Sequence, residues 1–156
     1  MANNYYSEIN LHLTWHTKLS HPLLTADIEA MTYACLREKA AKLGDVLVHE
    51  IGGTETHVHL AISIEPTVQI SELVGALKGY SSHEVNRRLG LKNVAIQWQT
   101  GYGVVSFGTK DFPWVIGYVR RQKEHHARGH IFDRLERIER YDDRPPAAEA
   151  DETEAP

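Results

Sequence analysis

One stretch of the chain, residues 56–64, alternates between polar and apolar side chains from end to end. A period of two is typical of a β-strand with one face in the core. The apolar face is aliphatic, and the opposite face carries two histidines, His57 and His59. Side chains two residues apart on one face lie about 7 Å apart at Cα, close enough for both imidazoles to bind one metal ion.

The histidine pair is weak evidence when taken alone. The chain has 10 histidines among 156 residues, so a chance His-x-His pair is roughly an even bet. Two polar side chains on a solvated strand face are the alternative interpretation. The choice between a metal site and a solvated strand face therefore depends on the neighbouring elements.

The order of elements along the chain is β-α-β-β-α-β followed by helical segments. Period-two or strand-like patterns cover residues 6–17, 45–51, 56–64, 94–98 and 103–107, and helical patterns cover residues 26–43, 70–89, 111–122 and 131–140. This order predicts a ferredoxin-like α+β fold, an antiparallel sheet with two helices on one face. His57 and His59 would then lie on the open face, where the last helix could complete a site.

Length, charge and cysteine content define the broad class. A chain of 156 residues with one cysteine and 42% hydrophobic residues fits one globular domain without disulfides. The last 15 residues carry six acidic side chains against Arg144, a net charge of −5, so the total of −4 leaves +1 for residues 1–141. We expect one domain over residues 1–140 and a disordered acidic tail over residues 141–156. Neither a signal peptide nor a membrane span is evident, which favours the cytoplasm.

Tyr118 and Gln122 are four residues apart on the predicted helix and share one face. The Gln122 amide oxygen is a hard ligand suited to Mg²⁺ or Mn²⁺. Tyr118 would then place a phenol beside the cation, which can polarise a phosphoryl oxygen while the tyrosine forms a covalent bond. The alternatives are a packing tyrosine and a surface glutamine.

Four segments together carry a family resemblance: residues 52–60, 77–82, 98–103 and 118–126. In this order they resemble the HUH single-tyrosine transposases, the small TnpA-type enzymes of insertion sequences and their REP-associated relatives. The resemblance covers residues 5–132. It implies that His57, His59 and Gln122 bind a divalent metal and that Tyr118 is the nucleophile.

The same resemblance implies a substrate and an assembly. Family members cut single-stranded DNA near hairpins, link the tyrosine to the 5′ phosphate and release a 3′ hydroxyl. They are homodimers, often with the tyrosine helix completing the partner's site. Thr56 stands where many relatives carry an acidic residue, and Glu50 and Glu55 are the expected substitutes, with water as the alternative.

Basic and aromatic side chains are interleaved in the second half of the chain, as on surfaces where bases stack and cations follow the phosphates. The candidate DNA contacts are Lys78, Tyr80, Arg87, Arg88, Trp98, Tyr102, Arg120, Arg121, Lys123 and Arg128. Two other functions remain open. One is a non-catalytic or domesticated protein that binds single-stranded nucleic acid. The other is a replication or relaxase-type nickase, which usually needs a longer chain.

Overall fold

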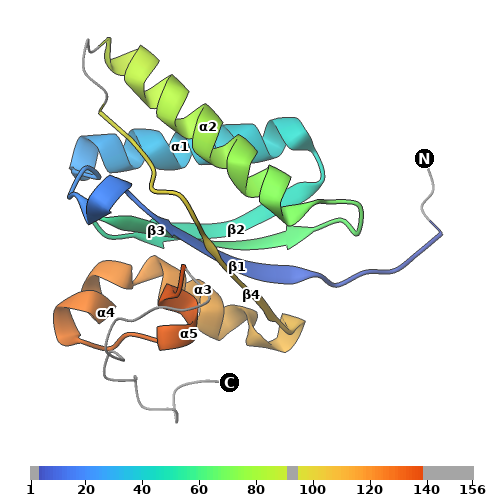
Figure 1. Cartoon of the computed structure of the whole chain (residues 1–156). Helices are drawn as coiled ribbons and strands as arrows, with labels where there is room; N and C mark the ends of the chain where they lie inside the picture. Colours follow the sequence, from blue (N-terminus) through green and yellow to red (C-terminus); the bar gives the residue numbers. More distant parts are fainter. Residues whose placement is uncertain (1–3, 91–94, 139–156) are drawn as a thin grey trace.

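The computed structural model describes residues 4–90 and 95–138, so the predicted acidic tail lies outside the described part. One antiparallel sheet has the strand order β2-β3-β1-β4, with β1 at Asn10–His16, β2 at Val46–Gly53, β3 at His57–Ile64 and β4 at Gly103–Phe107. One face is covered by α1 (Ala26–Leu43) and α2 (Ile70–Leu89) (Figure 1). The predicted ferredoxin-like α+β fold is confirmed.

The opposite face of the sheet is covered as well (Figure 1). Its cover consists of α3 (Phe112–Arg120), α4 (Gln122–Arg128) and α5 (Asp133–Glu136). Short 3-10 turns η1 (Lys18–Ser20) and η2 (Thr109–Asp111) precede α1 and α3. No helix in the described ranges has the length and apolar content needed to cross a membrane.

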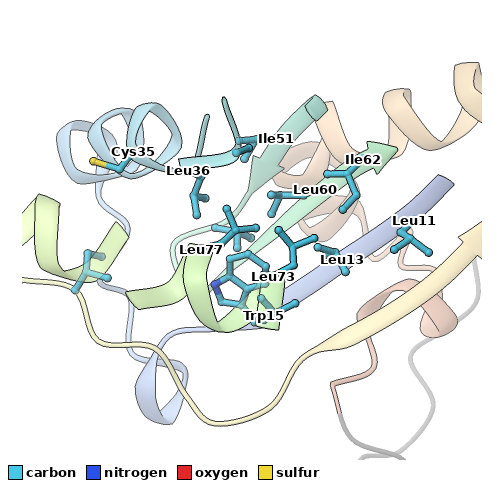
Figure 2. Packing of buried hydrophobic residues seen from close by; sticks show 14 of the residues in the cluster. Leu11, Leu13, Trp15, Cys35, Leu36, Ile51, Leu60, Ile62, Leu73 and Leu77 are labelled. Carbon is cyan, nitrogen blue, oxygen red and sulfur yellow. The ribbon is translucent and has the colours of Figure 1, made fainter. Parts of the chain in front are cut away.

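The main core lies between the sheet and the α1–α2 layer (Figure 2). Alternation along β1 and β3 sends the aliphatic residues and Trp15 to this side, where Trp15 is fully buried. Full burial of one large aliphatic side chain contributes about 1.5–3 kcal/mol to the stability of the fold. The strands are thereby held with their polar residues turned to the other face.

The polar face of β1 and β3 is also buried, because α3–α5 cover it. On β1 this face carries Asn10, His12, Thr14 and His16. The antiparallel register pairs His16 with His57 and Thr14 with His59. Four histidines, His12, His16, His57 and His59, therefore lie together between the sheet and the α3–α5 layer.

Two glycines bring the C-terminal layer close to the sheet. A Cβ at Gly52 on β2 would overlap the backbone carbonyl of Val119 on α3. A Cβ at Gly103 on β4 would overlap the backbone carbonyl of Arg137, just after α5. Only glycine permits such close backbone approaches.

The predicted strand at residues 94–98 was wrong within the described residues. Residues 95–98 form only an isolated bridge, between Thr17 and Trp98. The Asn86 side chain takes the place of a strand neighbour, because its Oδ1 accepts from Ala95 N and Ile96 N at 2.6 and 3.0 Å.

The last helical predictions were partly wrong. The segment predicted as one helix over residues 111–122 divides at Arg121, whose φ of −104° and ψ of 31° are not helical. The segment predicted over residues 131–140 is helical only at Asp133–Glu136, and residues 139 and 140 lie outside the described part. Tyr118 therefore lies in the last turn of α3, and Gln122 begins α4.

Candidate metal centre and tyrosine site

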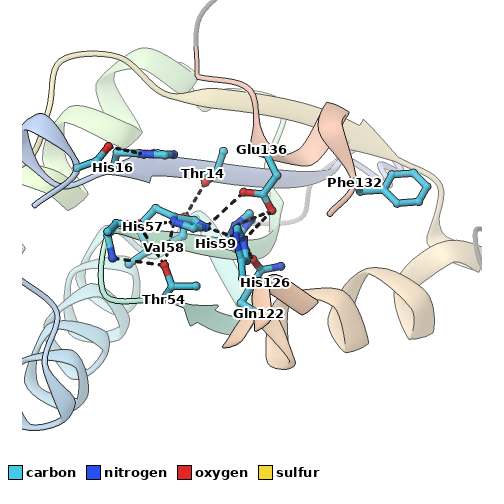
Figure 3. A network of polar contacts seen from close by, with 12 residues as sticks. Thr14, His16, Thr54, His57, Val58, His59, Gln122, His126, Phe132 and Glu136 are labelled. Atoms are coloured by element: carbon cyan, nitrogen blue, oxygen red, sulfur yellow. Dashed lines mark hydrogen bonds and ion pairs between the residues drawn. The ribbon is translucent and has the colours of Figure 1, made fainter. Parts of the chain in front are cut away.

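Three histidines and one glutamate from three elements meet on the covered face of the sheet. They are His57 and His59 of β3, His126 of α4 and Glu136 of α5. One ligand-type atom from each lies within 4.8 Å of those of the others. Figure 3 shows the Glu136 carboxylate pointing toward the imidazoles.

The Glu136 carboxylate is buried among the imidazoles. Its oxygens lie 3.3 Å from His57 Nε2, 3.3 Å from His59 Nε2 and 3.5 Å from His126 Nε2. Burial favours the protonated acid, but interactions with the three imidazoles outweigh it and hold the Glu136 pKa below its usual range. Burial lowers the pKa of His57 to about 4, so its ring is neutral at physiological pH.

Hydrogen bonds on the far side of each ring orient the two β3 histidines. His57 Nδ1 lies 3.0 Å from the hydroxyl oxygens of both Thr54 and Thr56. His59 Nδ1 lies 2.8 Å from Nε2 of His12, a buried neighbour on β1 whose pKa is lowered mainly by burial. In both rings Nε2 is left facing the cluster, as partners behind a metal-binding histidine would leave it.

Tyr118 reaches the same cluster from α3. Its hydroxyl donates to Glu136 Oε1 at 2.7 Å and accepts from Phe132 N at 2.9 Å. The ring is stacked with Trp114 and His125, at centroid distances of 5.5 and 5.0 Å, and the residue is only 3% exposed. Burial, with the Glu136 charge, raises the pKa of the phenol well above its usual range, so the hydroxyl keeps its proton.

Gln122 lies at the break between α3 and α4 and is fully buried. Its Nε2 donates to the Tyr118 carbonyl at 2.9 Å. Its Oε1 lies 3.0 Å from His126 Nε2, which in turn lies 3.1 Å from His57 Nε2. The structure thus brings together all four residues that the sequence singled out for chemistry.

A divalent cation fits this set of residues. Imidazole nitrogens with a carboxylate or amide oxygen are ligands for Mn²⁺, Zn²⁺ and related ions. His59 Nε2 is buried, faces the Glu136 carboxylate at 3.3 Å and makes no regular hydrogen bond with the described residues, so it is in position to bind a cation. One ligand-type atom from each of the three histidines and Glu136 already lies within 4.8 Å of the others.

The candidate DNA contacts on α2 lie across the sheet from this cluster (Figure 1). Lys78 donates to the carbonyls of Gln99 and Gly101, both at 2.8 Å. The other three are bound to acidic side chains: Tyr80 and Arg88 to Glu38, and Arg87 and Arg88 to Glu84. Tyr102 packs against the core and Trp98 donates to Ser81 Oγ.

The candidate contacts on α3 and α4 lie on the same side as the cluster. Arg120 pairs with Glu50 at 2.8 Å, Lys123 with Glu29 at 2.6 Å and Arg128 with Glu124 at 3.2 Å. Arg121 instead folds back on its helix and donates to the Gly117 carbonyl. It lines a cavity of about 460 Å³ beside the Tyr118 ring.

Sequence reasoning missed three members of the site. The carboxylate comes from Glu136. Neither expected substitute joins the cluster, because Glu50 pairs with Arg37 and Arg120 and Glu55 is exposed. His126 falls within the 118–126 motif, but the sequence alone does not single it out as a ligand. His12 gave one signal, its place on the polar face of the first strand.

Comparisons with known proteins identify the family to which the chain belongs. The family model described as "Transposase IS200 like" matches residues 5–122. The ISDra2 transposase TnpA of Deinococcus radiodurans is 33% identical over 85 residues, and the match spans 54% of this chain and 59% of that relative.

Two solved structures share the fold. A crystal structure of a candidate transposase from Deinococcus radiodurans R1 has a TM-score of 0.61 at 23% identity, covering 76% of this chain and 94% of that one. A REP-associated tyrosine transposase bound to a REP hairpin has a TM-score of 0.50 at 17% identity, covering 83% of this chain and 74% of that one. Since the family model spans most of the chain, the protein belongs to the IS200-like transposase family.

Proposed function

We propose that this transposase cuts and rejoins single-stranded DNA with Tyr118 as the nucleophile. The observation that carries the proposal is the 2.7 Å hydrogen bond between the Tyr118 hydroxyl and Glu136, because it places the phenol in the histidine cluster. Tyr118 Oη gives its proton to the Glu136 carboxylate and attacks the phosphorus of a phosphodiester, the bond from phosphorus to O3′ breaks, and the leaving O3′ takes up a proton. The products are a 5′-phosphotyrosine and a free 3′ hydroxyl, and the reverse reaction rejoins strands.

His57 and His59, through Nε2, and Gln122, through Oε1, are the proposed ligands of Mg²⁺ or Mn²⁺. His126 and Glu136 are further candidates because their atoms lie in the same cluster. A bound cation supplies a Lewis acid for the phosphoryl oxygen. The threonines behind His57 and the histidine behind His59 hold the two rings in place.

Tyr118 is protonated and enclosed, so the residues around it must both accept its proton and allow DNA to reach it. The Glu136 carboxylate accepts the hydrogen bond from the phenolic proton, which must leave when the phosphate ester forms. The 132–136 segment also covers the hydroxyl, so a DNA phosphate reaches it only when that segment moves. The proton acceptor and the cover of the hydroxyl therefore both come from residues 132–136.

The substrate is proposed to be single-stranded DNA with hairpins, bound by Lys78, Tyr80, Arg87, Arg88, Tyr102, Arg120, Arg121 and Lys123. Support comes from the hairpin bound to the REP-associated structure with the same fold. A homodimer is part of the proposal. Within one chain Tyr118 already meets the cluster, and exchange of residues 112–136 between two copies would give the same contacts.

The test is incubation with hairpin-containing single-stranded DNA and Mg²⁺ or Mn²⁺, followed by a denaturing gel. The parent protein is expected to form a covalent adduct, and Tyr118→Phe is expected to bind the DNA without forming one. An adduct that persists in Tyr118→Phe would assign the nucleophile to another residue.

A second candidate function, a non-catalytic binder of single-stranded nucleic acid, is favoured by the enclosed Tyr118 hydroxyl. Calorimetric titration with Mn²⁺ separates the two. The transposase predicts uptake that His57→Ala abolishes, whereas the binder predicts no uptake in either protein.

A further inference from the structure

His12 contacts the cluster without offering an atom to it. It lies on β1, is 1% exposed, and its Nε2 lies 2.8 Å from His59 Nδ1. The two rings are 4.9 Å apart at their centroids and tilted by 45°. The other His12 nitrogen, Nδ1, is buried without a regular hydrogen-bond partner among the described residues.

With both rings neutral, two proton arrangements are compatible with this contact. In the first, His12 Nε2–H donates to His59 Nδ1, and the single His59 proton sits on Nε2, 3.3 Å from the Glu136 carboxylate. In the second, His59 Nδ1–H donates to His12 Nε2, and the His12 proton sits on Nδ1. Only the second arrangement leaves a lone pair on His59 Nε2 for a cation.

We propose that His12 is a positioning residue that sets the tautomer of His59, and that both rings exchange tautomers when a divalent cation binds. This inference rests on the proposed metal site. Without a cation, the carboxylate opposite His59 Nε2 favours a proton there, and His12 is the donor. When the cation binds His59 Nε2, the proton moves to Nδ1 and His12 becomes the acceptor.

An imidazole can do this because each of its nitrogens can donate or accept. A phenylalanine at position 12 would fill the space but leave the His59 Nδ1–H buried without an acceptor. Removing such a partner behind a metal ligand typically lowers metal affinity 10–100-fold. A glutamine keeps both an acceptor and a donor and should restore most of the affinity.

The first experiment is calorimetric titration of the full chain with Mn²⁺ at pH 7.5. His12→Phe should weaken Mn²⁺ binding 10–100-fold, and His12→Gln should recover most of it. The matched control is His49→Phe, because His49 Nε2 also has one side-chain partner, the part-buried Ser63 hydroxyl at 2.7 Å, but lies outside the cluster. Equal affinity in His12→Phe and the parent would overturn the role of His12, whereas no Mn²⁺ uptake by the parent would overturn the metal site itself.

The second experiment needs no variant and therefore does not depend on whether His12→Phe folds. Two-bond ¹H–¹⁵N spectra of the parent report which ring nitrogen carries the proton, before and after adding diamagnetic Zn²⁺. Both His12 and His59 should change from Nε2–H to Nδ1–H. A His12 tautomer that stays unchanged while Zn²⁺ binds would overturn the proposal.

Discussion

The Tyr118 hydroxyl is held between two atoms of one short segment, donating to Glu136 Oε1 at 2.7 Å and accepting from Phe132 N at 2.9 Å. The proposed nucleophile, Tyr118, is thus also a structural link between α3 and the 132–136 segment. Substitution of this residue should consequently change stability as well as chemistry.

Tyr118→Phe should lower the free energy of unfolding by about 1–3 kcal/mol, since it leaves the part-buried Phe132 N–H without its acceptor and the buried Glu136 carboxylate without this donor. Urea denaturation measures the change. The control is Tyr33→Phe, because the Tyr33 hydroxyl is buried without a hydrogen-bond partner in the described ranges. Its removal should be nearly neutral, and an equal loss in both variants would argue against a special role for the Tyr118 hydrogen bonds.

Acid should destabilise the metal-free protein between pH 6.5 and 4. The His57 pKa is about 4 in the folded chain, against about 6.5 when unfolded, so the unfolded chain binds a proton that the folded chain excludes. Stability is therefore full above pH 6.5 and falls as the pH approaches 4, by roughly 3 kcal/mol in total. Urea denaturation of EDTA-treated protein across this range measures the slope, and His57→Gln should flatten it. The same slope in both proteins would assign it to other groups.

Gly52→Ala should destabilise the docking of α3 on the sheet. The new Cβ overlaps the backbone carbonyl of Val119, which cannot move without shifting the helix that carries Tyr118. Overpacking of this kind costs about 1–3 kcal/mol. Denaturant unfolding should show the loss, and Mn²⁺ affinity should fall too because Gly52 is paired with His59.

The control for that substitution is Gly75→Ala on α2, where a Cβ would meet nothing within 4 Å. Alanine in a helix is favoured over glycine by about 0.5–1 kcal/mol, so this variant should be slightly more stable. If Gly52→Ala behaved like Gly75→Ala, the close approach of β2 to α3 would not constrain the fold.

Gly117→Ala should weaken DNA binding without destabilising the protein. A Cβ at Gly117 would lie 2.6 Å from Arg121 Nη2, and this flexible side chain would have to leave its place beside the Tyr118 ring. Helix propensity should raise stability by about 0.5–1 kcal/mol. Fluorescence anisotropy with single-stranded hairpin DNA measures affinity, with Gly75→Ala as the reference. Unchanged affinity would show that the folded-back position of Arg121 is not used in binding.

The sheet and its two main helices could be predicted because their signals are local. Alternation in residues 56–64 gave both the strand and the face on which His57 and His59 lie, and helical spacing gave α1 and α2 within a residue or two. The false strand at residues 94–98 shows the limit of such signals. Ala95 N and Ile96 N donate to the Asn86 side chain, a contact that period-two patterns do not encode.

The site was harder to predict because it depends on contacts between distant segments. Glu136 lies on a four-residue helix, too short for any periodicity, and its neighbours in sequence do not suggest burial. The helix breaks at Arg121, where neither glycine nor proline predicts a break. The following helix nevertheless directs His126 toward His57. Most candidate DNA-binding cations are paired with acidic side chains, which composition cannot reveal.

The cluster draws on residues from both ends of the described chain, with His12 behind it on the first strand and Glu136 on the last helix. During synthesis the sheet can therefore form before the carboxylate has left the ribosome. A polypeptide interrupted after α4 would retain all four strands and every histidine of the cluster, but would lack the group that joins them to Tyr118. The contacts of Glu136 with the histidines and with Tyr118 can thus form only after residue 136 has been translated.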